Sequence, residues 1–258
     1  LEKQGKRLGV CYKGIDLSQL KTLDEFLSDF ESRSPFDIRD IEFIKKQNRI
    51  VFSRIGMGDP LDISFYQSNG GYDALRNALS LNHQTIIDKI KESGLTGRGG
   101  AAFPTGIKMQ TVSDQNDSIK YLACNADKGD GGTFSDRLIM ESDPFSLIEG
   151  MTIAAFAVGA SKGYIYLRSE YPLAKTYLKR AIETARENNF LGSNIQSSGF
   201  DFDIDLRIGA GSYVCGEETA MMESIEGRRG LVRSKPPLPA INGLFEKPTL
   251  INNIVTLA

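Results

Sequence analysis

The residues best suited to chemistry gather in a glycine-rich stretch, residues 94–108, which reads GLTGRGGAAFPTGIK. Five glycines share these positions with Arg98, Phe103 and Lys108. Glycine allows positive φ angles and lets a flat or anionic ligand lie close to the backbone. The two cations add the charge that a phosphate or pyrophosphate requires. The stretch therefore indicates a nucleotide-type ligand, and the alternative is an ordinary glycine-rich turn.

One part of this stretch, Gly97-x-Gly99-x-x-Ala102, matches the dinucleotide-binding pattern G-x-G-x-x-G/A. That pattern requires a strand before it. Here Ile86, Ile87 and Ile90 have helical spacing instead, and Gly94 is typical of a helix C-terminus. A simple Rossmann interpretation of this loop is therefore not favoured.

Polar side chains also follow an expected strand and a second glycine-rich segment. Asn125 and Asp127 come after the short apolar strand 121–124. An amide and a carboxylate can bind the edge of a ring or a ribityl chain, although they can also form an Asx turn. Glu217 and Glu218 open a helix after the glycine-rich residues 209–216. They suit hydrogen bonds to ribose hydroxyls, or they serve as partners of the helix dipole.

Two further polar positions lie near the end of the sequence. Lys235 begins the segment Lys-Pro-Pro-Leu-Pro, residues 235–239, which is a stiff extended loop or a proline-rich connector. Asn252 and Asn253 lie in an apolar run and must find hydrogen-bond partners if they are buried. A cofactor or the neighbouring backbone would satisfy them equally well.

The elements that must position these residues alternate between strands and helices. Strands are expected over residues 121–124, 163–167 and 202–208, and helices over residues 172–187 and 217–226. This alternation predicts an α/β fold, a Rossmann-like sheet sandwich whose ligand lies where loops converge at the carboxyl ends of the strands. Residues 56–258 are expected to form this domain. Residues 1–55 are expected to form a short, mainly helical appendage, with helical spacing over residues 20–30.

The composition excludes several other classes of protein. The chain has 258 residues, 40% hydrophobic and 25% charged, with a net charge of −2 and no dense basic block, so nucleic acid is not an expected partner. The longest apolar run, residues 151–160, is too short to span a bilayer, and no leader opens the sequence, which predicts a cytoplasmic protein. Three separated cysteines and one histidine, His83, expected at the surface or a helix cap, predict no metal site. Redox chemistry carried by a cofactor fits such a chain.

Five blocks in a fixed order, residues 97–108, 124–137, 209–227, 235–239 and 247–253, give the chain a specific resemblance. From about residue 56 it resembles the family of FMN- and NADH-binding flavoprotein subunits of respiratory complex I and its soluble relatives. Those relatives are the diaphorase subunits of NAD-reducing hydrogenases and the beta subunits of NAD-dependent formate dehydrogenases. The resemblance implies an NADH dehydrogenase or diaphorase within a multi-subunit complex.

The resemblance also implies the residues of the site. FMN would be bound by Gly97, Arg98, Gly99, Gly100, Lys108, Asn125, Asp127, Tyr213, Gly216, Glu217, Glu218, Asn252 and Asn253. NADH would stack on the flavin and meet Phe103, Asp130, Glu218 and Lys235, with Glu218 and Lys128 as the catalytic residues. Hydride would pass from NADH to FMN, a step that depends on stacking and positioning. Electrons would then pass singly to iron–sulfur clusters of partner segments, because three cysteines cannot hold the four-cysteine cluster of the family within this chain.

Lys128 stands where this family usually has glutamate. At an effective dielectric constant of about 20, each unit charge a few ångströms away is worth on the order of several kcal/mol before screening. We therefore expect Lys128 to favour the anionic reduced flavin and to raise its potential. Two alternatives are a homologue that has lost NADH turnover and acts as a scaffold subunit, and a nucleotide-binding regulator without flavin.

The expected nicotinamide site departs from the family in its aromatic residues. Leu238 replaces a frequent phenylalanine, and Thr111 lies near the position of another aromatic residue, so that Phe103 is the one clear stacking ring. This predicts a modest affinity for the nicotinamide cofactor. Asp130 keeps an acidic side chain, which predicts NAD rather than NADP because a 2′-phosphate would meet like charge. Faster flavin reduction by NADPH than by NADH would contradict this prediction.

Overall fold

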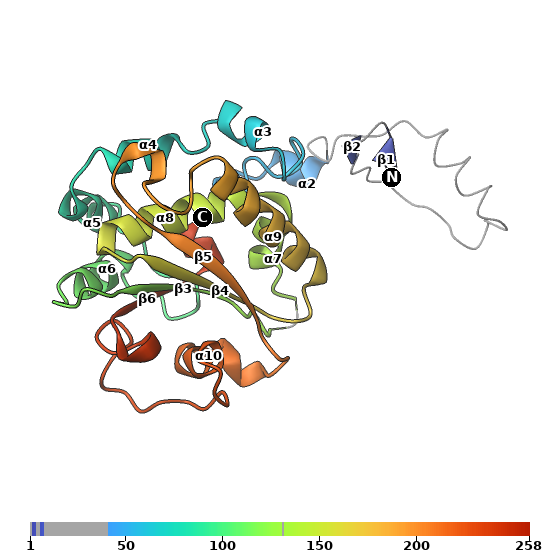
Figure 1. Ribbon diagram of the computed structural model, residues 1–258. Coiled ribbons are helices and arrows are strands. Elements are labelled where there is room, and N and C mark those ends of the chain that lie inside the picture. Colours follow the sequence, from blue (N-terminus) through green and yellow to red (C-terminus); the bar gives the residue numbers. More distant parts are fainter. Residues whose placement is uncertain (1, 4–5, 8–40, 131) are drawn as a thin grey trace. The chain divides into compact units, whose positions relative to one another are not determined.

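The computed structural model describes residues 2–3, 6–7, 41–130 and 132–258 (Figure 1). The chain divides into two units, Leu1–Asp59 and Pro60–Ala258. In the first unit, the short strands β1 (Glu2–Lys3) and β2 (Lys6–Arg7) pair antiparallel, and α2 covers Glu42–Lys45. The helix predicted from the spacing of residues 20–30 lies outside the described residues.

The second unit is built on a four-stranded parallel sheet in the order β5-β4-β3-β6. Its strands are β3 (Tyr121–Ala126), β4 (Lys162–Leu167), β5 (Asp203–Ile208) and β6 (Thr249–Asn253). β3 and β4 are short apolar runs because they lie in the middle of the sheet with both faces covered. β5, one of the two edge strands, alternates polar and apolar residues and is only partly buried. The predicted α/β fold with a parallel sheet is therefore confirmed.

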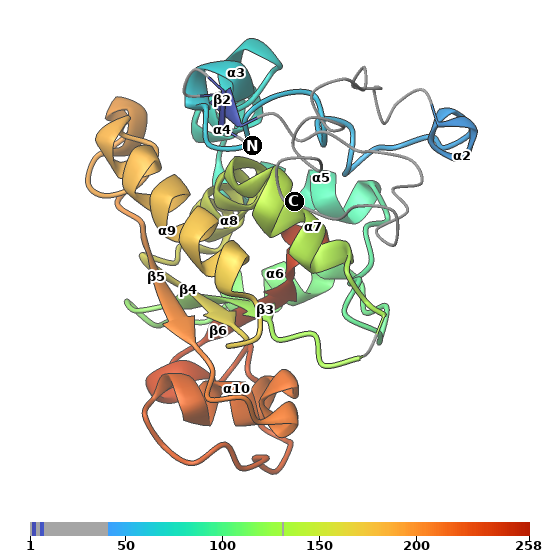
Figure 2. The same ribbon diagram turned by 90° about the vertical axis from the view of Figure 1, so that its right-hand side faces the viewer.

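One face of this sheet is covered by α7 (Ser135–Ser142), α8 (Pro144–Val158), α9 (Pro172–Glu187) and the short α11 (Ile254–Leu257), as Figures 1 and 2 show. α8 is apolar on almost every side because it packs against α4, α5, α6, α7, α9, α11 and the sheet. It begins at a proline and ends at Gly159, whose φ of +75° suits a helix C-terminus.

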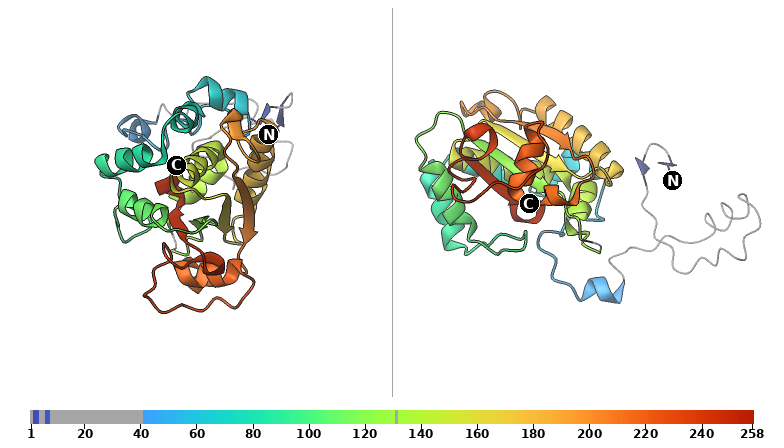
Figure 3. Two further views of the ribbon diagram at one scale, coloured as in Figure 1. Left: turned by 60° about the vertical axis from the view of Figure 1, so that its left-hand side comes forward. Right: turned by 90° about the horizontal axis from the view of Figure 1, so that it is seen from below.

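The opposite face of the sheet carries α10 (Glu218–Ile225) and the 3₁₀ turns η4 (Tyr213–Gly216) and η5 (Leu244–Glu246). Figures 1 and 2, and the left view of Figure 3, show α10 on the side of the sheet away from α8 and α9. Met221, Met222 and Leu244 pack there against Tyr164 and Ile251 of the sheet. The sheet is thus enclosed between two layers, as a sheet sandwich requires.

The remaining helices of this unit are α3 (Ile63–Ser68), α4 (Asp73–Leu79), α5 (His83–Glu92), α6 (Thr105–Ser113) and the 3₁₀ turn η3 (Ile195–Ser197). A buried carboxylate ties two of them to α8: Glu149 accepts hydrogen bonds from the Tyr66 hydroxyl at 2.6 Å and from the N–H groups of Tyr72 and Leu75 at 2.7 and 3.0 Å. His83, the first residue of α5, is exposed, as the sequence predicted. Within the described residues, no helix has both the length and the apolar character needed to cross a bilayer.

Candidate functional site

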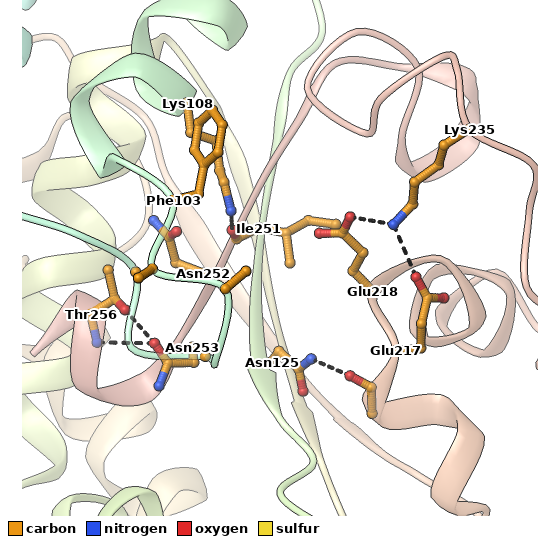
Figure 4. A pocket seen from close by; sticks show the side chains of 15 residues that line it. Phe103, Lys108, Asn125, Glu217, Glu218, Lys235, Ile251, Asn252, Asn253 and Thr256 are labelled. Atoms are coloured by element: carbon orange, nitrogen blue, oxygen red, sulfur yellow. Dashed lines mark hydrogen bonds and ion pairs between the residues drawn. The ribbon is translucent and has the colours of Figure 1, made fainter.

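A cavity of about 310 Å³ opens at the carboxyl edge of the sheet (Figure 4). It is lined by the glycine-rich loop, by the ends of β3 and β6, by the turn before α10, and by Lys108, Lys235 and Thr256. These segments are distant in the sequence, and the parallel strands bring them together because their carboxyl ends share one edge.

The glycine-rich loop connects α5 to α6, and its two ends lie next to each other. The Gly97 N–H donates to the Phe103 carbonyl at 2.8 Å, which holds the two ends of the loop together. Gly100 has a φ of +125°, which a residue with a side chain rarely adopts. The Arg98 N–H donates to the Thr256 hydroxyl at 2.9 Å and so ties the loop to α11. A helix rather than a strand precedes the loop. The match to the dinucleotide-binding pattern therefore does not correspond to a Rossmann strand–loop–helix unit.

Lys108 projects from the first turns of α6 into the cavity (Figure 4). Its ammonium donates to the Ile251 carbonyl of β6 at 2.9 Å. Burial lowers the pKa of Lys108. The negative charge of Glu218 raises this pKa, and the positive charge of Lys235 lowers it further. In the described part of the chain, Lys108 forms no ion pair, so two of its three N–H groups can meet an anionic ligand.

Asn125 links the end of β3 to the turn before α10. Its side-chain amide donates to the Gly216 carbonyl at 2.8 Å, and its oxygen accepts from the Asp127 N–H at 3.1 Å. A Cβ atom at Gly216 would lie 2.9 Å from the Asp127 carbonyl, so this approach of two loops requires glycine. The structure thus positions one side-chain amide at the junction of two loops.

Glu217 and Glu218 have different roles although they are neighbours. The Glu217 carboxylate caps α10, accepting from the N–H groups of Thr219 and Ala220 at 2.8 and 3.0 Å. Burial opposes its ionisation, but these bonds and that from Lys235 hold the pKa of Glu217 below its usual value. Lys235 bonds Glu218 at 2.6 Å and Glu217 at 3.1 Å. Glu218 is therefore held by a cavity side chain, whereas Glu217 is held mainly by the helix that it caps.

Most of the predicted site residues line the cavity: Gly97, Gly99, Phe103, Lys108, Asn125, Gly216, Glu217, Glu218, Lys235, Asn252 and Asn253. Other predicted residues do not: Arg98, Gly100, Asp127, Lys128, Asp130 and Tyr213. Arg98 meets the site through its backbone N–H, which bonds Thr256. The exposed Tyr213 donates its hydroxyl to Asp130 at 3.1 Å. The Lys128 carbonyl accepts from Arg168, which holds the loop after β3.

The sequence interpretation missed Thr256, and its expected site residues did not include Ala101, Ala102 and Ile251, which also line the cavity. Thr256 matters because its hydroxyl joins the glycine-rich loop to the start of α11. A signal for it was present. Asn253 is followed three residues later by Thr256, and the Asn253 oxygen accepts from the Thr256 N–H at 3.3 Å, as an N-cap does.

Comparison with known proteins identifies relatives of the chain. Residues 90–258 match the family described as the Nuo51 FMN-binding domain. The chain is 50% identical over 214 residues to the NADP-reducing hydrogenase subunit HndC of Solidesulfovibrio fructosivorans, covering 83% of this chain and 44% of that protein. It is 49% identical over 210 residues to a subunit of the NADH-quinone oxidoreductase of Rhizobium meliloti (strain 1021), covering 81% and 50%.

A solved structure is similar as well. The NAD+-reducing NiFe hydrogenase in the air-oxidized state aligns with a TM-score of 0.61 and 41% identity, covering 68% of this chain and 29% of that chain. The chain spans about half the length of the curated relatives it matches. The resemblance carried by the five sequence blocks is confirmed by these matches. The chain belongs to the family of the Nuo51 FMN-binding domain.

Proposed function

We propose that this chain is the FMN- and NADH-binding module of an NADH dehydrogenase or diaphorase, in which residues 56–258 form the module and residues 1–55 an N-terminal appendage. One observation carries the proposal: a glycine-rich loop and the ends of two parallel strands enclose a cavity that contains both a half-buried lysine and a lysine–glutamate cluster. Bound FMN would supply two-electron chemistry toward NADH and one-electron chemistry toward iron–sulfur clusters.

The cavity has the features that an FMN site requires. Its volume falls within the range of small-molecule sites. Gly97 and Gly99 present backbone without side chains to the cavity. Lys108 has N–H groups available for the phosphate, whereas Lys235 is engaged by two carboxylates. We therefore assign the phosphate to Lys108, and polar ring and ribityl contacts to Asn125 and Asn252, while Asn253 lines the cavity beside them.

The NADH half of the proposal rests on residues at the mouth of the cavity. Phe103 is 47% exposed there, so its ring can stack on a base. Glu218 can accept from ribose hydroxyls, and Lys235 holds its carboxylate in place. Asp130 lies outside the cavity lining, and the preference for NAD over NADP remains a prediction.

The proposal extends to the partners of the chain. Among the described residues, no group of three or more His, Cys, Asp or Glu side chains is placed to hold a metal ion. We propose that iron–sulfur clusters of partner segments receive the electrons within a multi-subunit, cytoplasmic complex. Cys124 and Cys215 are buried free thiols, which is consistent with a reducing compartment.

The direct test is to reconstitute the purified protein with FMN and to add NADH without oxygen. Binding should quench flavin fluorescence, and NADH should bleach the flavin absorbance faster than NADPH does. Flavin binding without bleaching would favour a scaffold subunit. Binding of NAD by a protein that never takes up flavin would favour a nucleotide-binding regulator.

Changing Lys128 to glutamate is expected to lower the midpoint potential of bound FMN by roughly 30 mV or more, since about 1.4 kcal/mol corresponds to 30 mV for a two-electron couple. The reason is that glutamate replaces positive with negative charge and disfavours the anionic reduced flavin. Redox titration measures the change. Lys179→Glu, the same change on the exposed side of α9, is the control and should shift the potential little. An unchanged or higher midpoint in Lys128→Glu would contradict the prediction.

A further inference from the structure

Asp136, in the first turn of α7, is a buried carboxyl group that the proposed chemistry does not use. It is 1% exposed, and neither of its oxygens has a hydrogen-bond partner in the described part of the chain. A carboxyl group is rarely buried in this way without a function, because removing it from water is costly. Its surroundings therefore need an explanation.

The groups around Asp136 belong to the site. The Asn253 side-chain amide and the Val255 N–H approach the carboxyl without reaching hydrogen-bond geometry, and the positive charge of Lys128, in the loop after β3, also acts on it. Burial raises the pKa of Asp136 to about 6, and these three groups oppose the rise. Burial, followed by the charge of Asp136, raises the pKa of the Cys124 thiol on β3. The carboxyl is thus directed at the junction of β6 and α11.

Asn253 offers the matching group. Its oxygen is occupied, because it accepts from both the N–H and the hydroxyl of Thr256. Its nitrogen is buried and has no hydrogen-bond partner among the residues that the structure describes. Figure 4 shows the oxygen turned toward Thr256 and the nitrogen turned away from it. The unused donor of Asn253 and the unused acceptor of Asp136 therefore complement each other.

These contacts form a chain of donors with one direction. The Arg98 N–H donates to the Thr256 hydroxyl, the Thr256 hydroxyl donates to the Asn253 oxygen, and the Asn253 nitrogen faces Asp136. A carboxylate only accepts, so it fixes the direction of every bond before it. Such chains polarise each bond in turn. The Asp136 carboxylate, at the end of this chain of donors, therefore affects how firmly the glycine-rich loop is held.

We propose that Asp136 is a positioning residue of the FMN site, whose carboxylate orients the Asn253 amide and thereby holds the glycine-rich loop through Thr256. The inference rests on the proposed function and adds a residue outside the cavity. Without the carboxylate, the Asn253 amide is free to rotate and to point its nitrogen at the Thr256 N–H. Two donors would then face each other, and the Arg98 N–H would lose its fixed acceptor.

The test compares Asp136→Leu and Asp136→Asn with the wild type. Fluorescence titration of the FMN-free protein should show FMN binding weakened roughly ten- to a hundredfold in Asp136→Leu, because losing the charge that orients the Asn253 amide should cost about as much as losing a hydrogen bond to a charged group. Asp136→Asn retains an accepting oxygen and should lie between Asp136→Leu and the wild type. Glu141→Gln removes a carboxylate from the same helix, where it pairs with Arg137, and should bind FMN as the wild type does. Equal affinities in all four proteins would overturn the proposal.

A second measurement separates positioning from general stability and does not require flavin. Hydrogen exchange at the Arg98 amide should become at least about tenfold faster in Asp136→Leu, while amides in the core of α8 keep their protection. Unchanged exchange at Arg98 would overturn the inference even if wild-type FMN binding confirmed the proposed function. A wild type that binds no FMN would refute the proposed function, and the exchange result would still decide the role of Asp136.

A double-mutant cycle tests whether Asp136 acts on the glycine-rich loop through Thr256. Thr256→Val removes the hydroxyl in the middle of the donor chain, so it should weaken FMN binding to a similar degree. Because both changes break one chain, Asp136→Leu combined with Thr256→Val should cost little more than either change alone. Losses that add fully would show that Asp136 acts by another route, and would overturn the proposal.

Discussion

Replacing Lys108 by methionine is expected to weaken FMN binding roughly ten- to a hundredfold while leaving riboflavin binding nearly unchanged. Hydrogen bonds to charged groups contribute about 1.5–3 kcal/mol, and about 1.4 kcal/mol is a tenfold change in affinity. Methionine matches the shape of the lysine stem but lacks the ammonium. Riboflavin lacks the phosphate, so it isolates the contact assigned to Lys108.

The measurement is a fluorescence titration of each variant with FMN and with riboflavin. The wild type should prefer FMN strongly, and Lys108→Met should lose most of that preference. Arg98→Gln is the matched control, since Arg98 meets the site through its backbone N–H and its side chain is absent from the cavity lining. A Lys108→Met protein that still prefers FMN, or an Arg98→Gln protein that does not, would place the phosphate elsewhere.

The sequence could not predict which of the two cations of the glycine-rich stretch, Arg98 or Lys108, enters the cavity. Their types and spacing predicted an anion-binding loop, and the structure places Lys108 in the cavity. The pattern did not distinguish it from Arg98, because the Lys108 ammonium bonds β6 and the Arg98 backbone bonds α11, and both elements are more than a hundred residues away. A pattern along one segment carries no information about such a contact.

The strand ends were more predictable than the loops. Asn125, Asn252 and Asn253 follow or end apolar runs, and parallel strands place such residues at one edge. The pair Glu217 and Glu218 was predicted, but only the hydrogen bonds show that Glu217 caps α10. Asp136 gave no signal, because a single aspartate in an amphipathic helix is usually exposed. Its burial follows from the packing of α7 against α8, α9 and α11.

Gly150 provides the strongest test of how the fold supports the site. It lies in α8, and a Cβ atom there would be 1.7 Å from the Leu257 carbonyl oxygen of α11 and 2.8 Å from its carbon. Both atoms are backbone, so no side-chain rotation can relieve the overlap. α11 would have to move, and it carries Thr256, while Asn253 caps its first turn. We therefore expect Gly150→Ala to reduce both stability and FMN affinity.

The expected loss in the free energy of unfolding is on the order of 3 kcal/mol, because forced overpacking of a core typically costs about 1–3 kcal/mol and here opposes a rigid helix. Alanine is the better helix former by about 1 kcal/mol, which reduces the loss slightly. Urea denaturation measures the stability, and titration measures FMN binding. Gly97→Ala is the stability control, since its Cβ atom would lie 3.5 Å from the Phe103 carbonyl, an ordinary contact. If Gly150→Ala kept both properties of the wild type, α8 would not hold α11 in place, and the support of the site would have to come from the loops themselves.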